Sequence, residues 1–245
     1  MNKITSTSII RCLLVFLFFL FFSRSYSQNV SFEHITQNDG LPSPTVTCIY
    51  KDSYGFMWFG TQRGLVKYDG YSYTVFDKVP SEKTVNVTNF FFKSIVQPND
   101  STLLIVLSYN GFYIFNIYTE KFTLVLNDVP GDWNNVYSLY IDQLKNIWIA
   151  TGQGLELFDL KKKSFLQYSL RNYLEFSATK TSGAVTSIQQ DRMGNLWLFC
   201  INGYVGVFSV STKKWRFIRY SNNPVSSNTL SHGGKLHFDQ HHTLW

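Results

Sequence analysis

The stretch DSYGFMWFGTQRGLVKYDG, Asp52 to Gly70, places a turn, an aromatic strand, a second turn and another strand in close succession. Related phrases return as DQLKNIWIATGQGLELFD from Asp142 and DRMGNLWLFCINGYVGVFS from Asp191. Aligning the copies on the tryptophan gives four equivalent tryptophans and one weaker copy with isoleucine in that slot: Trp58, Ile105, Trp148, Trp197 and Trp245. The chain is therefore an array of repeats with a period of about 45–50 residues.

Each copy has the pattern of four short strands joined by tight turns. In the first copy the strands are expected at 46–52, 56–61, 65–69 and 71–76, with turns at DSYG, QRG and DG. The second strands FMWFG, NIWIA and NLWLF are almost continuously apolar, which is typical of a sheet covered on both faces. We therefore predict an all-β fold, a β-propeller of four-stranded blades with the tryptophans packed between blades. Gly60 and Ala150 are expected to make room for a side chain of the neighbouring blade.

The chain divides into a leader and a repeat region. A basic start, an apolar run at 12–22 and small residues at Ser25 and Ser27 indicate a signal peptide at 1–27. The apolar run is too short to cross a bilayer core of ~30 Å. Residues 28–245 are expected to form the partial propeller, with repeats at about 46–76, 92–125, 136–168, 185–220 and a truncated one at 230–245. About four and a half blades cannot close a ring, so we expect a fragment or a shortened copy of a longer protein.

Charge and cysteine content exclude some functions. The formal net charge of +6 falls to +3 once Lys3, Arg11 and Arg24 leave with the leader. This modest value does not indicate nucleic-acid binding. Cys48 and Cys200 are far apart in the sequence, and a domain of this length does not need a disulfide. We do not expect them to pair.

The segment from Ile35 to Phe76 closely resembles the two-component regulator propeller repeat, whose pattern is GLP followed by VxxIxxDxxGxxWxGTxxGLxx(Y/F)D. The copies around Trp148 and Trp197 keep most of this pattern, and the copy around Ile105 is degenerate. The resemblance implies the N-terminal sensor region of a hybrid two-component histidine kinase with seven-bladed propellers. It also implies a periplasmic location, an oligosaccharide ligand and a homodimer in the full-length sensor. The kinase domain and the membrane span of such relatives are absent from this sequence.

No catalytic or metal-binding constellation stands out. The sequence has no GxSxG, HExxH, phosphate loop or CxxC motif, and no cofactor is expected. Asp52, Asp142, Asp191 and Asp239 recur with the blade period, so we interpret them as turn-capping residues. A histidine-rich tail falls mainly in one exposed turn, and we do not predict a metal site there; its members are His232, His237, His241 and His242.

Ligand-binding candidates are the positions where equivalent turns differ. The turn between the second and third strands carries a different residue before its glycine in each copy: Arg63, Asn110, Gln153 and Asn202. The connections between blades emerge at the same edge and contain Trp133 and Tyr173. Aromatic faces suit the C–H surface of a sugar, and amides or charges suit its hydroxyl groups. These six residues are our candidate oligosaccharide site.

Two other functions stay open at the level of sequence. An extracellular propeller of this composition could serve as a protein-interaction or dimerisation scaffold. A propeller enzyme of the polysaccharide-lyase type is more remote, because no acid–base pair is evident.

Overall fold

The computed structural model describes residues 32, 34–77, 91–107, 111–126, 136–170, 173, 184–201, 203–220, 235–241 and 243–245. The chain separates into two units, Met1–Ile35 and Thr36–Trp245, and every described strand belongs to the second. The expected signal peptide lies outside the described residues. Among the helices that the described part contains, none is long and apolar enough to cross a membrane.

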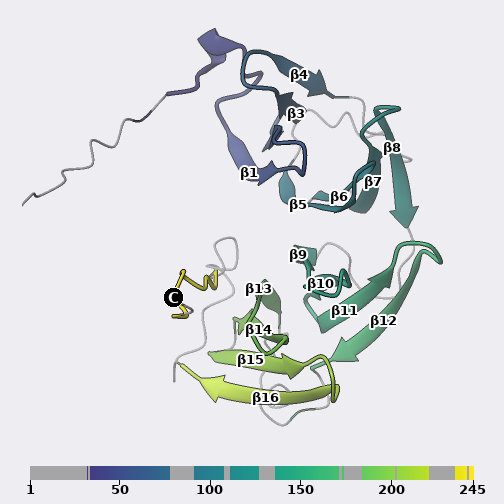
Figure 1. The fold of residues 1–245 in the computed structure, drawn as a ribbon, viewed down its shortest axis with the longest axis vertical. Coiled ribbons are helices and arrows are strands. Elements are labelled where there is room, and N and C mark those ends of the chain that lie inside the picture. Colours follow the sequence, from purple (N-terminus) through teal and green to yellow (C-terminus); the bar gives the residue numbers. More distant parts are fainter. Residues whose placement is uncertain are drawn as a thin grey trace, which may run out of the picture. The chain divides into compact units, whose positions relative to one another are not determined.

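In the described part of the chain, sixteen strands form four separate antiparallel sheets, which we call blades 1 to 4 (Figure 1). Blade 1 contains β1 (Val46–Lys51), β2 (Met57–Thr61), β3 (Gly64–Tyr68) and β4 (Tyr73–Phe76). Blade 2 contains β5 (Phe92–Asn99), β6 (Thr102–Leu107), β7 (Gly111–Asn116) and β8 (Lys121–Leu126). Blade 3 contains β9 (Val136–Ile141), β10 (Ile147–Thr151), β11 (Gly154–Asp159) and β12 (Ser164–Ser169). Blade 4 contains β13 (Val185–Gln190), β14 (Asn195–Cys200), β15 (Tyr204–Ser209) and β16 (Lys214–Arg219).

Every blade is a meander in which each strand pairs with the next one along the chain. The described residues contain no α-helix, and a single 3-10 turn at Gln37–Asp39 precedes β1. A fifth copy begins with an isolated bridge between Phe238 and Leu244. The prediction of an all-β fold built from four-stranded blades is confirmed.

The hydrophobic core lies between neighbouring blades. The second strands of blades 2 and 3, β6 and β10, are buried on both faces, whereas burial alternates along β14 of blade 4. In β6 the side chains of Leu103, Ile105 and Leu107 join Trp58 of blade 1 in one cluster. The alternate residues of β6, Leu104 and Val106, pack in another cluster with residues of blade 3. This arrangement explains why the second strands are continuously apolar rather than alternating.

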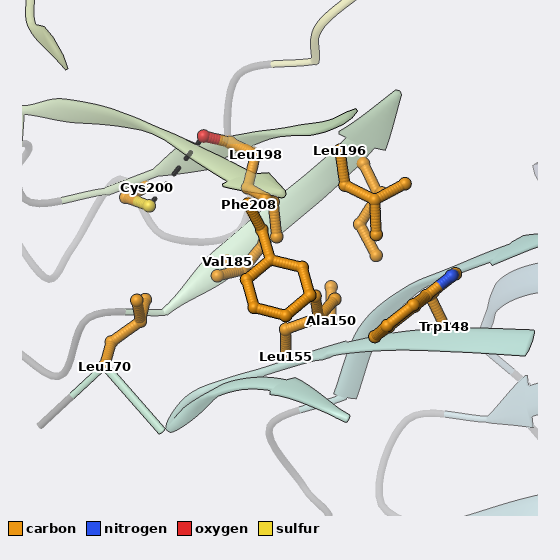
Figure 2. Packing of buried hydrophobic residues seen from close by; sticks show 10 residues of the cluster. Trp148, Ala150, Leu155, Leu170, Val185, Leu196, Leu198, Cys200 and Phe208 are labelled. Carbon is orange, nitrogen blue, oxygen red and sulfur yellow. Dashed lines mark hydrogen bonds between the residues drawn. The ribbon is translucent and has the colours of Figure 1, made fainter. Parts of the chain in front are cut away.

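The contact between blades 3 and 4 shows the role of the tryptophan. Trp148 is fully buried in a cluster with Leu155 of its own blade and Leu196 and Phe208 of the next (Figure 2). Its ring meets Phe208 edge-on at 5.7 Å between centroids. Trp148 therefore packs between two blades, as the repeat pattern led us to expect.

Gly60 allows a close approach of blades 1 and 2. A Cβ added at this position would lie 2.3 Å from Cβ of Phe92 and 2.7 Å from Sγ of Cys48. Side chains do not approach one another so closely, so no larger residue fits unless the blades move apart. Ala150 occupies the corresponding place in the buried cluster between blades 3 and 4.

Candidate functional site

Each repeated aspartate organises the turn between the first and second strands. Oδ1 of Asp52 accepts hydrogen bonds from the backbone N–H groups of Tyr54 and Phe56, both at 2.9 Å. Oδ2 accepts a hydrogen bond from the indole Nε1 of Trp58 at 2.8 Å. Asp142, Asp191 and Asp239 make the same three kinds of contact with their own turns and with Trp148, Trp197 and Trp245. The carboxylate is thus occupied by the fold and offers no general acid or base.

Blade 2 has lost both members of this pair together. Ile105 has no N–H group to donate, and Asn99 replaces the aspartate. Oδ1 of Asn99 still accepts a hydrogen bond from the backbone N–H of Ser101 at 3.1 Å, so the turn keeps a cap. Without an indole there is no need for a second acceptor oxygen, which explains the joint replacement.

Glutamines connect the blades beside these turns. The backbone N–H of Gln97 donates to the hydroxyl of Tyr50 at 3.2 Å, and Oε1 of Gln97 accepts from the backbone N–H of Ser53 at 2.7 Å. Between blades 3 and 4, Oε1 of Gln190 accepts from the backbone N–H of Gln143 at 2.8 Å. Since each bond joins residues far apart in the sequence, the pattern of one copy alone could not predict it.

The opposite edge of each blade, which we call the glycine edge, carries the turns between the second and third strands. Its described residues are 61–64, 107, 111, 151–154, 200, 201 and 203. In blade 1 the hydroxyl of Thr61 donates to the carbonyl of Gly64 at 2.8 Å and accepts from the backbone N–H of Arg63 at 3.2 Å. Gly64 has a φ of 130°, and a Cβ there would lie 2.6 Å from the carbonyl oxygen of Phe76. The Thr-x-x-Gly pattern therefore fixes a tight turn whose tip is Arg63.

Arg63 and Gln153 stand at equivalent tips but have different surroundings. Arg63 is exposed. Gln153 is half-buried, and its Oε1 accepts a hydrogen bond from Nε2 of Gln167 on β12 at 3.2 Å. A ligand reaching this edge would thus meet a solvent-exposed cation on blade 1 and a fixed amide on blade 3.

The other candidate residues are only partly placed by the structure. Asn110, Trp133 and Asn202 lie outside the described residues. Tyr173 is half-buried, and its ring meets Phe217 edge-on at 5.2 Å, so it covers the cluster between blades 3 and 4. A role for these residues in binding stays a prediction.

Chemistry based on cysteine or metal finds no support in the described residues. Burial raises the pKa of the Cys48 and Cys200 thiols to about 12, so both stay protonated at neutral pH. Both are free cysteines. The described part of the chain contains no group of three or more potential metal-ligating side chains. Of the histidine-rich tail, His237 and His241 are exposed, and His232 and His242 are not described.

Sequence reasoning missed a buried carboxylate next to Gln153. Glu156 on β11 is 8% exposed, and its Oε2 has no hydrogen-bond partner. Burial raises the pKa of this carboxyl, and a hydrogen bond from Gln167 partly opposes the shift. Glu156 pairs across the strands with the residue that follows Trp148. The residues with the same cross-strand position in the other blades are Val66, Phe112 and Gly206. A glutamate in one copy, where the other copies have no charged residue, could have been noticed in the sequence.

Replacing Glu156 by leucine should stabilise the protein at pH 7 by about 1 kcal/mol, because the variant removes a buried oxygen without a partner. The pKa of Glu156 is higher in the folded state than in the unfolded state. Burial of this group therefore lowers the stability of the wild type as the pH rises through the folded-state pKa, and costs little at a pH below the unfolded-state pKa. The gain should therefore shrink in urea unfolding experiments repeated towards pH 4. A loss of stability at pH 7 would show that the carboxylate has a favourable role in the fold.

Comparisons with known proteins bear on this arrangement of repeats. The model of the family described as two component regulator propeller matches residues 40–63 and 130–153. Each matched segment ends on the glycine edge, at Arg63 and at Gln153. The chain carries two-component regulator propeller repeats.

A curated relative of this chain is much longer than the chain itself. Histidine kinase P4 of Formosa agariphila is 29% identical over 147 residues, which cover 54% of this chain and 10% of that protein. This chain thus spans about a tenth of the length of the curated relative that it matches.

Solved structures share the fold at low sequence identity. A protein described as the extracellular domain of a hybrid two component system from B. thetaiotaomicron superposes with a TM-score of 0.65 and 20% identity, covering 87% of this chain and 28% of that one. Virginiamycin B lyase from Staphylococcus aureus gives a TM-score of 0.58 and 12% identity, covering 75% of this chain and 59% of the lyase. At these identities the similarity establishes a common propeller fold and does not indicate a shared function.

Proposed function

We propose that this chain is the N-terminal part of a periplasmic sensor that binds an oligosaccharide and has no chemistry of its own. The repeats match those of two-component regulators, and a relative with similar sequence is a histidine kinase. The full-length sensor would be a homodimer, and a membrane span and kinase domain beyond this chain would transmit the signal.

The observation that carries the binding proposal is the glycine edge. Its turns are held by the same Thr–Gly contacts in blades 1 and 3, while the residue at the tip changes from Arg63 to Gln153. A rigid scaffold with variable tips is the usual arrangement of a binding surface. At the aspartate turns, by contrast, the repeated carboxylates are consumed by bonds within the fold.

Arg63 is the strongest single candidate for ligand contact because it is the one charged residue among the four equivalent tips. A guanidinium group presents five N–H donors, which suits a carboxylate or neighbouring hydroxyl groups of a sugar. Its backbone is positioned by Thr61, so the side chain can be removed without breaking the turn.

Replacing Arg63 by alanine should weaken binding of the best oligosaccharide by about ten-fold, the equivalent of one hydrogen bond to a charged group. Isothermal titration calorimetry would compare the wild-type chain with the variant against neutral xylo- and manno-oligosaccharides and acidic oligogalacturonates. Lys51→Ala is the control, because Lys51 is an exposed cation at the other end of blade 1. Unchanged affinity in Arg63→Ala for every sugar that binds would remove this edge of blade 1 from the site. Cleavage of the sugar would contradict a purely sensory role.

A further inference from the structure

The edge of blades 3 and 4 that carries the aspartate turns is strongly basic. We call it the basic edge and define it as residues 142–146, 159–164, 191–194 and 209–214. The exposed charged side chains of these turns, apart from that of Asp159, are all cations. They are Lys145, Lys161, Lys162, Lys163, Arg192, Lys213 and Lys214. On blades 1 and 2 the corresponding turns and strand ends balance Lys51, Lys67 and Lys121 against Asp69, Asp100 and Glu120. The excess of positive charge is therefore local.

The acidic groups of the basic edge are already engaged. Asp142 and Asp191 each bind the N–H groups of their turn and the indole of their tryptophan. Asp159 accepts hydrogen bonds from the backbone N–H groups of Lys161 and Lys162, and its carboxylate lies 3.8 Å from Nζ of Lys162. The contact between Lys162 and Asp159 is the one salt bridge among the described residues of this edge. The other cations are exposed, so their field extends into solvent.

Backbone geometry indicates that Lys145 is retained against local preference. It has a φ of 65°, in the left-handed region that long side chains rarely adopt. Lys163 and Lys213 have φ values of 53° and 58°, but Glu120 has 56° in the equivalent turn of blade 2, so there the conformation belongs to the turn and does not select lysine. In blades 1 and 4 the turn position of Lys145 is taken by Gly55 and Gly194, which adopt positive φ without strain. Non-glycine residues in such positions are a reason to suspect a function for the side chain.

Two apolar side chains project from the same edge. Leu144 is 75% exposed and Met193 is 84% exposed, and they occupy equivalent positions two residues after Asp142 and Asp191. Each is next to a cation, Lys145 or Arg192. The two turns lie on neighbouring blades joined by the bond between Gln143 and Gln190. Exposed apolar tips surrounded by lysine suit a surface that offers both negative charge and hydrocarbon.

We propose that the basic edge docks on an anionic phospholipid bilayer. Phosphate headgroups would neutralise the lysines, while Leu144 and Met193 enter the boundary of the acyl chains. A soluble polyanion would use the charge but leave these two side chains in water. The glycine edge lies at the opposite ends of the same strands, so docking would leave the proposed sugar site open and does not depend on it.

Vesicle co-sedimentation tests this docking directly. The wild-type chain should bind vesicles of phosphatidylglycerol and phosphatidylcholine, should bind phosphatidylcholine alone much more weakly, and should be released by salt. The double variant Lys145→Gly/Lys163→Gly should bind about 25-fold more weakly, about five-fold for each charge. Glycine accepts positive φ, so this variant keeps its fold. The protein tested starts at Gln28, the expected mature start, because the apolar run at 12–22 would bind any vesicle.

The controls separate charge at this edge from charge in general. Arg216→Gln/Lys235→Gln removes the same charge from exposed sites outside the basic edge and should bind as the wild type does. Leu144→Ser/Met193→Ser should weaken vesicle binding but leave binding to heparin unchanged. The proposal is overturned if the two glycine substitutions do not affect vesicle binding. It is equally overturned if heparin competes fully and the serine variant binds vesicles like the wild type, which would identify an acidic polymer as the partner.

Discussion

Replacing Trp148 by alanine should lower the free energy of unfolding by roughly 3–5 kcal/mol, the range of large-to-small changes in protein cores. The indole is fully buried between blades 3 and 4 and contacts Tyr168 and Phe208 at centroid distances of 5.8 and 5.7 Å. Its removal would leave a cavity between the two sheets, in the cluster that blades 3 and 4 share. Urea unfolding followed by circular dichroism would measure the change.

The chain contains a matched control for this experiment. Trp245 occupies the same repeat position and makes the same hydrogen bond, from Nε1 to Oδ2 of Asp239 at 3.0 Å, but it is 74% exposed. Trp245→Ala should therefore cost no more than about 1 kcal/mol, the value of one hydrogen bond. Equal losses in the two variants would mean that the hydrogen bond, rather than packing between blades, makes the tryptophan necessary.

Replacing Gly60 by alanine should destabilise the protein by about 2–3 kcal/mol, the upper part of the range for overpacked cores. The new methyl group would meet Cβ of Phe92 at 2.3 Å, and that atom is fixed to the backbone of β5. The only relief is a shift of blade 2 away from blade 1. Thermal unfolding monitored by circular dichroism should show a lower midpoint.

Gly206→Ala provides the comparison for Gly60. Gly206 is also in the middle of a strand, but the nearest neighbour of an added Cβ would be the ring edge of Trp215 at 3.2 Å, which can move by a few tenths of an ångström. This variant should be close to neutral. If Gly60→Ala is as stable as Gly206→Ala, blades 1 and 2 are not in tight contact at this position.

The fold followed from the sequence because the repeat shows its pattern several times. Trp58, Trp148 and Trp197 recur at one position of each copy, and the apolar run around them predicted sheets covered on both faces. The spacing of Asp142 from Trp148 was equally regular, yet the bond between carboxylate and indole was not foreseen. Spacing alone does not show that a buried indole N–H needs an acceptor and that the turn-capping aspartate has a free oxygen.

The site was less predictable, for reasons that are also physical. Gln97 and Gln190 link different blades, and such contacts depend on how sheets stack rather than on local pattern. Glu156 differs from Val66 at the equivalent place, but whether a carboxylate there is buried depends on the neighbouring blade. Arg63 and Gln153 were correctly placed on equivalent turn tips because the turn itself is encoded by a nearby threonine and glycine.

Hydrogen–deuterium exchange of the chain, with and without the oligosaccharide that gives the largest calorimetric heat, tests the central claim most directly. The account predicts slower exchange in the glycine-edge turns at 61–64 and 151–154, with no change in the aspartate turns at 52–56 and 142–146. Both sets are tight turns in the same blades, so general stabilisation would slow them alike. Slower exchange confined to the aspartate turns, or none at either edge despite binding, would contradict it.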